Sequence, residues 1–362
     1  MKIIYDFSAF VMQSNGGVSR VLYELFSHVS TMPDCNCVIF AGFHKNRYLK
    51  EAPARLKQRI IGLWLPECIV RQRIFMPINR FLFRIYTIMY KPDVCHYTYF
   101  FTPRVPGSCK VVITVHDMIH ELYPKTFSPS DPHREWKRQA VLRTDGIVCV
   151  SNNTKRDLEG LLDVSRKKIC VIPHGNSIRQ NTRATAPHDF NYFLYVGNRA
   201  SKYKNFSVLA QSISKIKSEM DCHLICFGGG EFTDEELRMF RDLQVINKVH
   251  FVAGSDDLLA SYYEYALALV YPSKYEGFGL PPIEAMSCRC PVIASSAPPM
   301  PEILAESVLY FNPDSINDLV RCMKEVCNGD CRKRLIETGE KQAELYQWNH
   351  AAMRAVQFYK TL

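Results

Sequence analysis

The stretch "YPSKYEGFGLPPIEAM" (Tyr271–Met286) places two glutamates, Glu276 and Glu284, on either side of a segment of glycine and proline. On one continuous helix these carboxylates would share a face, because their spacing corresponds to a little more than two turns. Proline lacks the backbone donor and clashes in a helix interior, so "GFGLPP" interrupts such a helix. The stretch therefore predicts a glycine-rich loop carrying Glu276, followed by a helix carrying Glu284.

Strand and helix signals alternate on both sides of this stretch. Short β-rich runs such as "VVITV" and "YFLYV" are separated by amphipathic segments, a pattern typical of parallel sheets wrapped by helices. The polar segment 175–191 lacks apolar periodicity and indicates a linker. We therefore predict an α/β protein of two Rossmann-like, doubly wound domains, 1–180 and 181–345, that face a cleft. A final helix, 346–362, is expected to cross back to the first domain.

Composition limits the class of protein. The 362 residues suit two domains, and no run of about 18 apolar residues predicts a membrane-spanning helix. Asp6 interrupts the apolar region that a signal peptide would need. The fourteen cysteines form no C-x-x-C pair and are expected to be buried, reduced thiols. These features favour a cytoplasmic protein.

Basic residues are concentrated in the window 43–91, which holds eleven Lys or Arg and two Glu. Within it, apolar residues recur at helical spacing; they are Ile74, Ile78, Phe81, Leu82, Ile85, Ile88 and Met89. Either this stripe packs into the core of an ordinary surface helix, or it forms a basic amphipathic surface for the anionic inner face of a membrane. No nucleic-acid-binding motif accompanies the charge, so no nucleic acid partner is expected.

Polar residues at predicted strand ends are the candidates for a site, because ligands of open parallel sheets bind at the carboxyl ends of the strands. Gly16 and Gly17 open a helix, where they either form an anion-binding nest or only a tight turn. His116 follows "VVITV" and either contacts a ligand hydroxyl or is structural. We expect His120, His174 and His250 to be structural.

A basic loop follows "YFLYVG" and precedes a helix. Arg199, Lys202 and Lys204 lie on it, with Asn205 as a candidate cap, and cations beside a helix N-terminus suit a diphosphate. Glu276 and Glu284 could instead accept hydrogen bonds from sugar hydroxyls, as acidic residues do in dinucleotide sites. Cations and carboxylates together favour a sugar nucleotide. The chain has no D-x-D pair, phosphate-binding P-loop or G-x-S-x-G nucleophile turn.

These residues resemble the family 4 glycosyltransferases, retaining enzymes of the GT-B fold. Glu276 and Glu284 match the E-x7-E signature of that family around "GFGLPPI". "GGVSR", "TVHDMIHELYP", "VSNNTKRDL", "VIPHG", "YVGNRASKYKNF", "HFVAGSDDLLASYY" and "APPMPEI" are similar to further family segments, in the family's order along nearly the whole chain.

The resemblance implies a role for each matching residue. Arg199 and Lys204 would bind the donor diphosphate, Glu276 the transferred sugar and Glu284 the ribose. His116 would lie beside the reacting sugar. The remaining donor contacts implied are made by Gly16, Gly17, the backbone around Val252, and the N–H groups of Phe278, Gly279 and Leu280. No cofactor and no divalent metal are expected, because cations of the protein would stabilise the leaving diphosphate. Lys202 is an extra basic residue relative to the family pattern, and the resemblance assigns it no contact with the donor.

The expected reaction is transfer of a hexose, for instance mannose, from a GDP- or UDP-linked donor to a saccharide or lipid-linked glycan, with retention of configuration. Biosynthesis of lipopolysaccharide O-antigen or of a capsule would use such a step. A GT-B-fold epimerase or phosphorylase, and a catalytically silent membrane-associated scaffold, are the alternatives. The base, the sugar and the acceptor are not specified by these residues.

Overall fold

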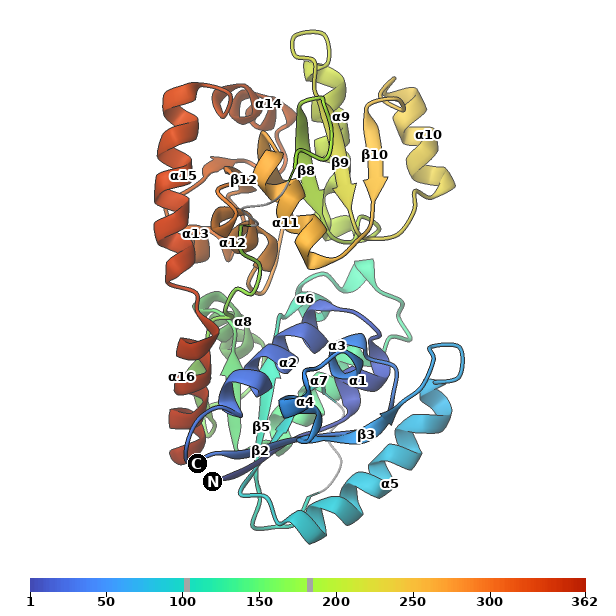
Figure 1. Cartoon of the computed structure of the whole chain (residues 1–362), viewed down its shortest axis with the longest axis vertical. Coiled ribbons are helices and arrows are strands. Elements are labelled where there is room, and N and C mark those ends of the chain that lie inside the picture. The colour runs from blue at the N-terminus through green and yellow to red at the C-terminus, as the bar shows by residue number, and fades with distance from the viewer. Residues whose placement is uncertain (101–104, 181–184) are drawn as a thin grey trace. The chain divides into compact units, whose positions relative to one another are not determined.

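The computed structural model describes residues 1–100, 105–180 and 185–362 (Figure 1). The chain divides into two compact units. Unit 1 comprises Met1–Leu122, Phe127–Gly175 and Trp348–Leu362, and unit 2 comprises Tyr123–Thr126 and Asn176–Gln347. In the predicted linker, 175–191, the described residues form neither helix nor strand, and residues 181–184 lie outside the described part.

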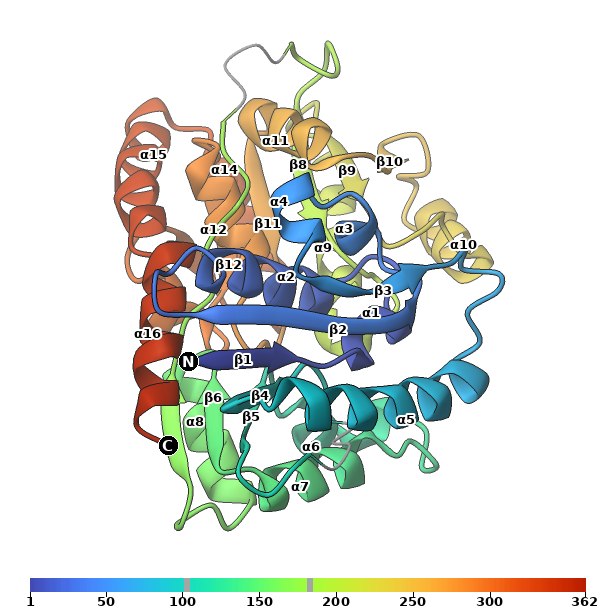
Figure 2. The ribbon, with the colours of Figure 1, turned by 60° about the horizontal axis from the view of Figure 1, so that its bottom comes forward.

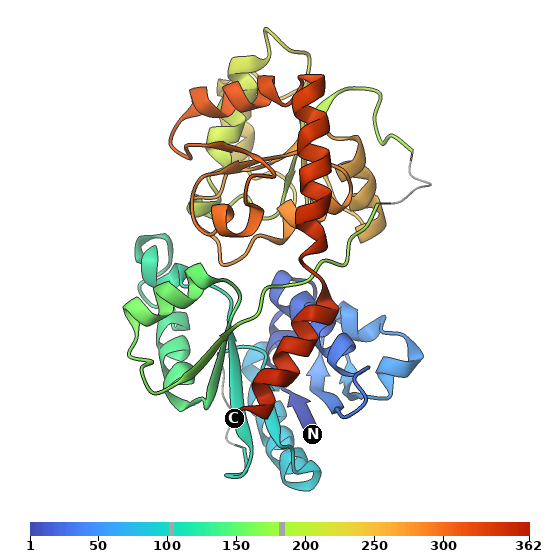
Figure 3. The ribbon, with the colours of Figure 1, turned by 90° about the vertical axis from the view of Figure 1, so that its left-hand side faces the viewer.

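Unit 1 is built on a parallel sheet of seven strands in the order β3-β2-β1-β4-β5-β6-β7 (Figure 2). The strands are β1 (Lys2–Tyr5), β2 (Asn36–His44), β3 (Ile60–Trp64), β4 (Val94–Tyr97), β5 (Lys110–Val115), β6 (Gly146–Cys149) and β7 (Lys168–Val171). The helices are α1 (Ser8–Met12), α2 (Gly17–Val29), α3 (Arg47–Lys50), α4 (Ala54–Lys57), α5 (Gln72–Tyr90), α6 (Ile119–Leu122), α7 (His133–Arg143), α8 (Asn152–Leu161) and α16 (Trp348–Lys360). In Figure 3, α16 (red) lies on unit 1, where it packs against α2, and the two chain termini are close together.

Unit 2 is built on a parallel sheet of six strands in the order β10-β9-β8-β11-β12-β13. Its strands are β8 (Tyr192–Val196), β9 (His223–Phe227), β10 (Val249–Val252), β11 (Ala268–Tyr271), β12 (Val292–Ser295) and β13 (Leu309–Phe311). Its helices are α9 (Phe206–Ile216), α10 (Asp234–Asp242), α11 (Asp256–Tyr265), α12 (Leu280–Ser287), α13 (Met300–Leu304), α14 (Ile316–Glu325) and α15 (Gly329–Glu344), with short 3₁₀ turns at Pro124–Thr126 and Lys202–Lys204.

Local sequence explains where these elements lie. The central strands β1, β6 and β11 are almost wholly buried, as expected of parallel strands covered on both faces. Ser151 accepts a hydrogen bond from the Thr154 N–H and caps α8, as serine commonly does at a helix N-terminus. The predicted α/β class with two doubly wound parallel sheets is therefore confirmed.

Three observations concern the composition arguments. None of the fourteen cysteines forms a disulfide, and ten of them are buried. Across the described residues, no helix has the length and apolar character that crossing a membrane requires. The apolar stripe of α5 does not pack into the core: only Asn79, Phe83 and Thr87 of this helix are buried. The first of the two alternatives for the window 43–91 is therefore wrong.

Candidate active site

The order in which the chain adds strands to the unit 2 sheet reverses between β8 and β11. From β8 the strand order runs outward through β9 and β10, and from β11 it runs outward through β12 and β13. In open α/β sheets this switch point is where ligands bind, beyond the carboxyl ends of the strands. The loop after β8 carries Arg199 and Lys204, and the loop after β11 carries Glu276. Two of the sequence-predicted segments therefore meet at one place.

Lys204 and Glu276 form an ion pair at this point. The Lys204 Nζ donates to Glu276 Oε1 at 2.6 Å, and the two side chains are 20% and 14% exposed. The ammonium group also lies 5.8 Å from the centre of the Tyr271 ring. Burial, and next the Glu276 carboxylate, raise the pKa of Tyr271 well above its usual range. Both charged side chains are therefore mostly buried, but each keeps a small part of its surface accessible to solvent.

Glu284 lies in α12 and is buried, with 3% of its surface exposed. Its Oε2 accepts a hydrogen bond from the Tyr263 hydroxyl at 3.1 Å. Burial, and next the charge of Glu284, raise the pKa of Tyr263 well above its usual range, so the phenol remains a donor. Tyr263 therefore fixes one of the two carboxylate oxygens of Glu284.

The glycine-rich loop ends directly at the N-terminus of α12. Gly279 is the N-cap residue with φ +96°, and a side chain there would come within 2.8 Å of Met300 Cε. Leu280 is the first helical residue, and both prolines fall in the first turn, where a missing N–H costs nothing. Phe278 buries its ring edge-on against Tyr346 at 5.4 Å. The loop that carries Glu276 therefore leads directly to the N-terminus of α12, with its unpaired backbone N–H groups and the positive end of its helix dipole.

Arg199 of the basic loop makes several hydrogen bonds within unit 2. Its Nε donates to Glu236 Oε1 at 2.7 Å, and its terminal nitrogens donate to the carbonyls of Gly228, Gly230 and Glu231 at 2.7–3.1 Å. The side chain is 2% exposed. The glycines that follow β9 have positive φ and turn these carbonyls toward the guanidinium. Arg199 is therefore buried among partners of unit 2, and its contact with a donor diphosphate remains a prediction.

Asn205 does not cap α9 with its side chain, contrary to the prediction. It adopts φ 57° and donates from Nδ2 to the carbonyls of Pro272 and Pro313, at 3.2 and 2.7 Å. These bonds join the end of the basic loop to the segments after β11 and after β13, directly beside Lys204. Val252 lies at the end of β10, and its carbonyl accepts from the Gly228 N–H at 2.8 Å.

His116 lies at the carboxyl end of β5 in unit 1. Its Nε2 is buried without a hydrogen-bond partner among the described residues. Burial lowers the pKa of His116 to about 4, and the neighbouring Asp117 opposes that shift. The imidazole is therefore neutral at physiological pH and can offer one nitrogen to a ligand.

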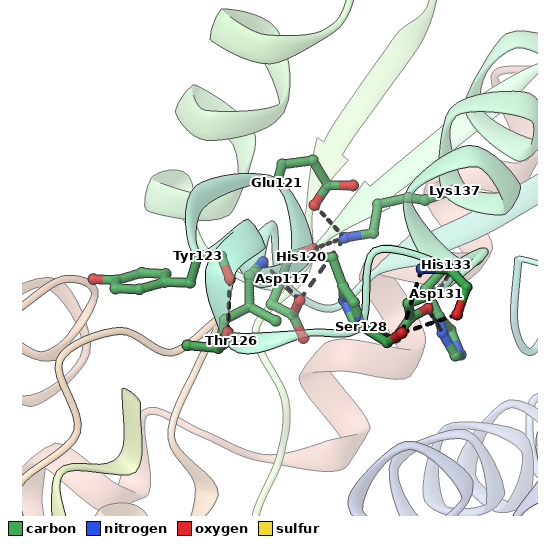
Figure 4. Close-up of polar contacts among 11 residues, drawn as sticks. Asp117, His120, Glu121, Tyr123, Thr126, Ser128, Asp131, His133 and Lys137 are labelled. Atoms are coloured by element: carbon green, nitrogen blue, oxygen red, sulfur yellow. Dashed lines mark hydrogen bonds and ion pairs between the residues drawn. The ribbon is translucent and has the colours of Figure 1, made fainter. Parts of the chain in front are cut away.

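The segment after His116 is held by a buried lysine that the sequence did not single out. Figure 4 shows Lys137 of α7 reaching the start of α6, where its Nζ donates to the Asp117 carbonyl and to Glu121 Oε2, each at 2.8 Å. Lys137 is 1% exposed. Lys137 lies on the buried side of α7 together with Ala140 and Val141, and no sequence motif distinguishes it from the exposed lysines of the chain.

Gly16 and Gly17 begin α2, but α1 separates them from β1. A side chain at Gly16 would collide with Gln13, whose Oε1 lies 2.4 Å from the added carbon. The same oxygen accepts from the Ser19 N–H at 3.0 Å. Gly17 faces open space. One donor of this helix N-terminus is therefore already satisfied by Gln13.

Comparison with known proteins agrees with this geometry. The family model for glycosyl transferases group 1 matches residues 177–342, and the model for Glycosyltransferase Family 4 matches residues 15–178. The chain belongs to the family 4 glycosyltransferases. Together the two models span the site segments of both units of this chain.

Two proteins with similar sequences are mannosyltransferases. The O-antigen chain mannosyltransferase RfbU of Salmonella typhimurium is 34% identical over 215 residues, 59% of this chain. An MMP α-(1→4)-mannosyltransferase of Mycolicibacterium hassiacum is 25% identical over 63% of this chain. The matched region spans 60% of the length of each of these two relatives.

Solved structures share the fold over the whole chain. Sucrose-phosphate synthase from Thermosynechococcus elongatus superposes with a TM-score of 0.79 at 21% identity, covering 99% of this chain and 98% of that one. Anabaena Alr3699/HepE, solved with UDP and glucose, gives 0.74 at 16% identity and covers both chains completely. The fold of this glycosyltransferase is therefore GT-B.

Proposed function

We propose that this chain transfers a hexose, mannose, from a GDP- or UDP-linked donor to a saccharide acceptor in the assembly of O-antigen or a similar polysaccharide. The observation that carries the proposal is the Lys204–Glu276 pair at the switch point of the unit 2 sheet, beside the N-terminus of α12. The mannosyl group is supported by the names of two relatives, an O-antigen and an MMP mannosyltransferase.

The donor would replace internal partners of the pair. A diphosphate offers Lys204 a stronger anion than Glu276, and the released carboxylate can then accept from hydroxyls of the sugar. Glu284, with Oε2 fixed by Tyr263, would accept from the ribose. The N–H groups of Phe278, Gly279 and Leu280 would bind phosphate or sugar oxygens, aided by the α12 dipole. Backbone groups near Val252 would contact the base.

The reaction we propose is attack of an acceptor hydroxyl on the anomeric carbon from the face that the diphosphate leaves, so that configuration is retained. The bond from the anomeric carbon to the phosphate oxygen breaks, and the nucleoside diphosphate departs with the bonding electrons. The hydroxyl proton passes to a departing phosphate oxygen. The chain would contribute positive charge from Lys204 and a fixed orientation, and His116 Nε2 would contact a sugar hydroxyl.

Metal independence is part of the proposal. The sequence lacks the D-x-D pair that carries a metal–nucleotide complex, and Lys204 with the α12 N-terminus supplies positive charge where the diphosphate would lie. Arg199 is proposed to add positive charge at the diphosphate, and its bonds to Glu236 and the three carbonyls also position the basic loop. No other cofactor is proposed.

The partners proposed are the nucleotide sugar and a lipid-linked glycan. Such an acceptor lies at a membrane, so we propose peripheral contact with the cytoplasmic face. The test is turnover of GDP- and UDP-hexoses with excess EDTA, using the wild type, Lys204→Ala and Glu276→Ala, with the product's anomeric configuration read by NMR. Transfer with retention that both substitutions abolish is expected. Wild-type rates in both variants would show that the site is assigned wrongly.

A further inference from the structure

The helix α5 presents its apolar side to solvent. Nine of the sixteen large apolar side chains that are exposed in the described part of the chain lie between residues 63 and 89, and seven of them belong to α5. Phe81 is 66% exposed and Met89 is 76% exposed. At 3.6 residues per turn the seven fall within about 120° of the helix circumference, so they form one continuous stripe.

The opposite side of α5 is held to the sheet in part by polar contacts. Asn79 is completely buried and pairs with the Phe43 backbone, donating to its carbonyl at 3.0 Å and accepting from its N–H at 2.9 Å. Thr87 is also completely buried and donates to the Arg84 carbonyl at 2.9 Å. A surface helix ordinarily places its apolar side inward. Of these bonds only those of Asn79 join α5 to the sheet, because the Thr87 bond lies within the helix. The inner side also carries apolar residues, among them Phe83 and Tyr86, that pack against the core of unit 1. The exposed stripe is therefore additional to the apolar contacts that anchor α5.

A groove extends the apolar stripe onto the sheet. It has a volume of about 350 Å³, and its lining is shared by α5 and the strands β2 and β3. Leu63 of the edge strand β3 forms one wall and is 56% exposed, while Leu82 and Met89 of α5 form the other. Figure 1 shows α5 (light blue) as the outermost element of unit 1 on this side. The stripe and the groove make one apolar face, which we call the α5 face.

Cations border the α5 face on one flank. Arg73, Arg80, Arg84 and Lys91 are exposed and lie within about 40° of one another around the helix axis. The helix α5 contains no acidic residue. An apolar stripe bordered by cations is the pattern of helices that lie in the headgroup region of anionic membranes.

We propose that the α5 face docks on an anionic lipid bilayer, with α5 parallel to the membrane plane, its apolar stripe inserted and its cations among the headgroups. The charge favours this partner over a second copy of the chain, because two such faces would bring their cation rows together. This inference gives the membrane contact a place in the fold. It is tested by binding without donor or acceptor, so it stands or fails separately from sugar transfer.

The test compares substitutions on and off the α5 face by sedimentation with vesicles of phosphatidylcholine, with and without phosphatidylglycerol. The apolar variant carries Phe81→Glu, Ile85→Glu and Ile88→Glu. Its control carries Leu142→Glu, Leu161→Glu and Met353→Glu, three similarly exposed positions of unit 1 with the same charge change. The cation variant carries Arg73→Gln and Arg84→Gln, and its control carries Arg134→Gln and Arg143→Gln, which are exposed on α7.

Wild type and both controls should bind vesicles that contain phosphatidylglycerol, and the apolar variant should lose binding more than tenfold. Each arginine removed should weaken binding about fivefold and reduce its salt dependence. Absence of wild-type binding, or equal losses in variants and controls, would overturn the proposal. So would a wild-type dimer that the apolar variant dissociates while vesicles have no effect. The cation variant decides the question if the apolar variant does not fold.

Discussion

Lys204 and Glu276 neutralise each other in the unliganded chain at a donor–acceptor distance of 2.6 Å. Both side chains keep a fifth or less of their surface exposed, which is enough for a ligand to reach them and too little for full screening by water. A donor with two charged phosphates and several hydroxyls can satisfy both partners at once. The ion pair therefore compensates the charges of the Lys204 ammonium and the Glu276 carboxylate, which are the two groups proposed to bind the donor.

Replacing Lys204 by alanine should lower kcat/KM for the donor by about 10²–10³, because a preorganised charge at the leaving group acts mainly in the transition state. Lys202→Ala is the matched control, since it removes a lysine from the same 3₁₀ turn. The control should stay within a few-fold of the wild type. Steady-state kinetics of both variants measure the difference, and equal losses would show that net charge of the loop matters rather than the Lys204 position.

The position of Arg199 in the basic loop did not reveal which groups its guanidinium contacts. The guanidinium satisfies Glu236 and three backbone carbonyls while remaining 2% exposed. Two of those carbonyls belong to Gly228 and Gly230, which together with Gly229 adopt positive φ in the turn after β9. The sequence showed a cation beside a predicted helix. It could not show that a distant glycine turn would enclose that cation.

Arg199→Gln should lower the free energy of unfolding by about 3–5 kcal/mol, since it leaves a partly buried carboxylate and several carbonyls without their partner. Arg241→Gln, on the exposed side of α10, should change it by less than about 0.5 kcal/mol. Denaturant unfolding followed by circular dichroism measures both. A fully stable Arg199→Gln protein with lost donor binding would assign Arg199 to the diphosphate alone.

At the scale of elements, α12 explains how the opening motif divides into two parts. Gly279 allows the turn, the prolines occupy the first turn, and Glu284 follows one turn inside the helix. This arrangement was predictable because each step rests on local backbone rules. The orientation of α5 was not, because periodicity gives the existence of an apolar stripe but not the direction it faces. In the structure the inward side of α5 is held by the Asn79 bonds to the Phe43 backbone and by core contacts of Phe83.

Gly279→Ala should destabilise the chain by roughly 1–3 kcal/mol, because the left-handed backbone is strained for a residue with a side chain. The new carbon would also meet Met300, which lines the same loop. We expect a higher KM for the donor, since the N–H groups of the loop would shift. Gly329→Ala is the control, because Gly329 lies in the first turn of α15 with open space around it. Kinetics and melting curves of both variants test this, and an unchanged Gly279→Ala would contradict it.

At the scale of the whole molecule, both sheets follow from one rule. Alternating β-rich and amphipathic segments can bury their apolar faces only as parallel sheets covered by helices. Ligands of such sheets bind beyond the carboxyl ends of the strands, so the main site segments were predictable, whereas the strand order was not predicted. Side-chain partners such as Tyr263 and Lys137 were not, because they come from elements whose packing a sequence pattern does not specify.

Stability should fall as pH drops from about 6.5 toward 4. Burial lowers the pKa of His44 and His116 to about 4, that of His96 to about 3, and that of His174 well below its usual value. Each folded pKa lies below the unfolded value, so the unfolded chain gains protons first and each histidine costs about 2 kcal/mol at about pH 5. Asp6, with its pKa raised to about 6 by burial, opposes one part of this loss. Urea unfolding at about pH 6.5 and at about pH 5 measures this change in the free energy of unfolding.

His44→Asn provides the check on that prediction. It removes one buried imidazole, so the loss of stability between neutral and about pH 5 should shrink by about 2 kcal/mol. An unfolding free energy that is flat over this range in the wild type would contradict the assigned histidines. An undiminished loss in the variant would contradict the part given to His44.

The melting temperature of the full chain in the presence of nucleoside diphosphates tests the central claim most directly. A ligand that binds only the folded chain stabilises it by about 2.7 kcal/mol at a hundredfold excess over its Kd. We predict that GDP or UDP raises the melting temperature of the wild type in EDTA, and that Lys204→Ala removes the shift while Lys202→Ala keeps it. No shift with any nucleoside diphosphate, or a full shift in Lys204→Ala, would contradict a donor site at the Lys204–Glu276 pair.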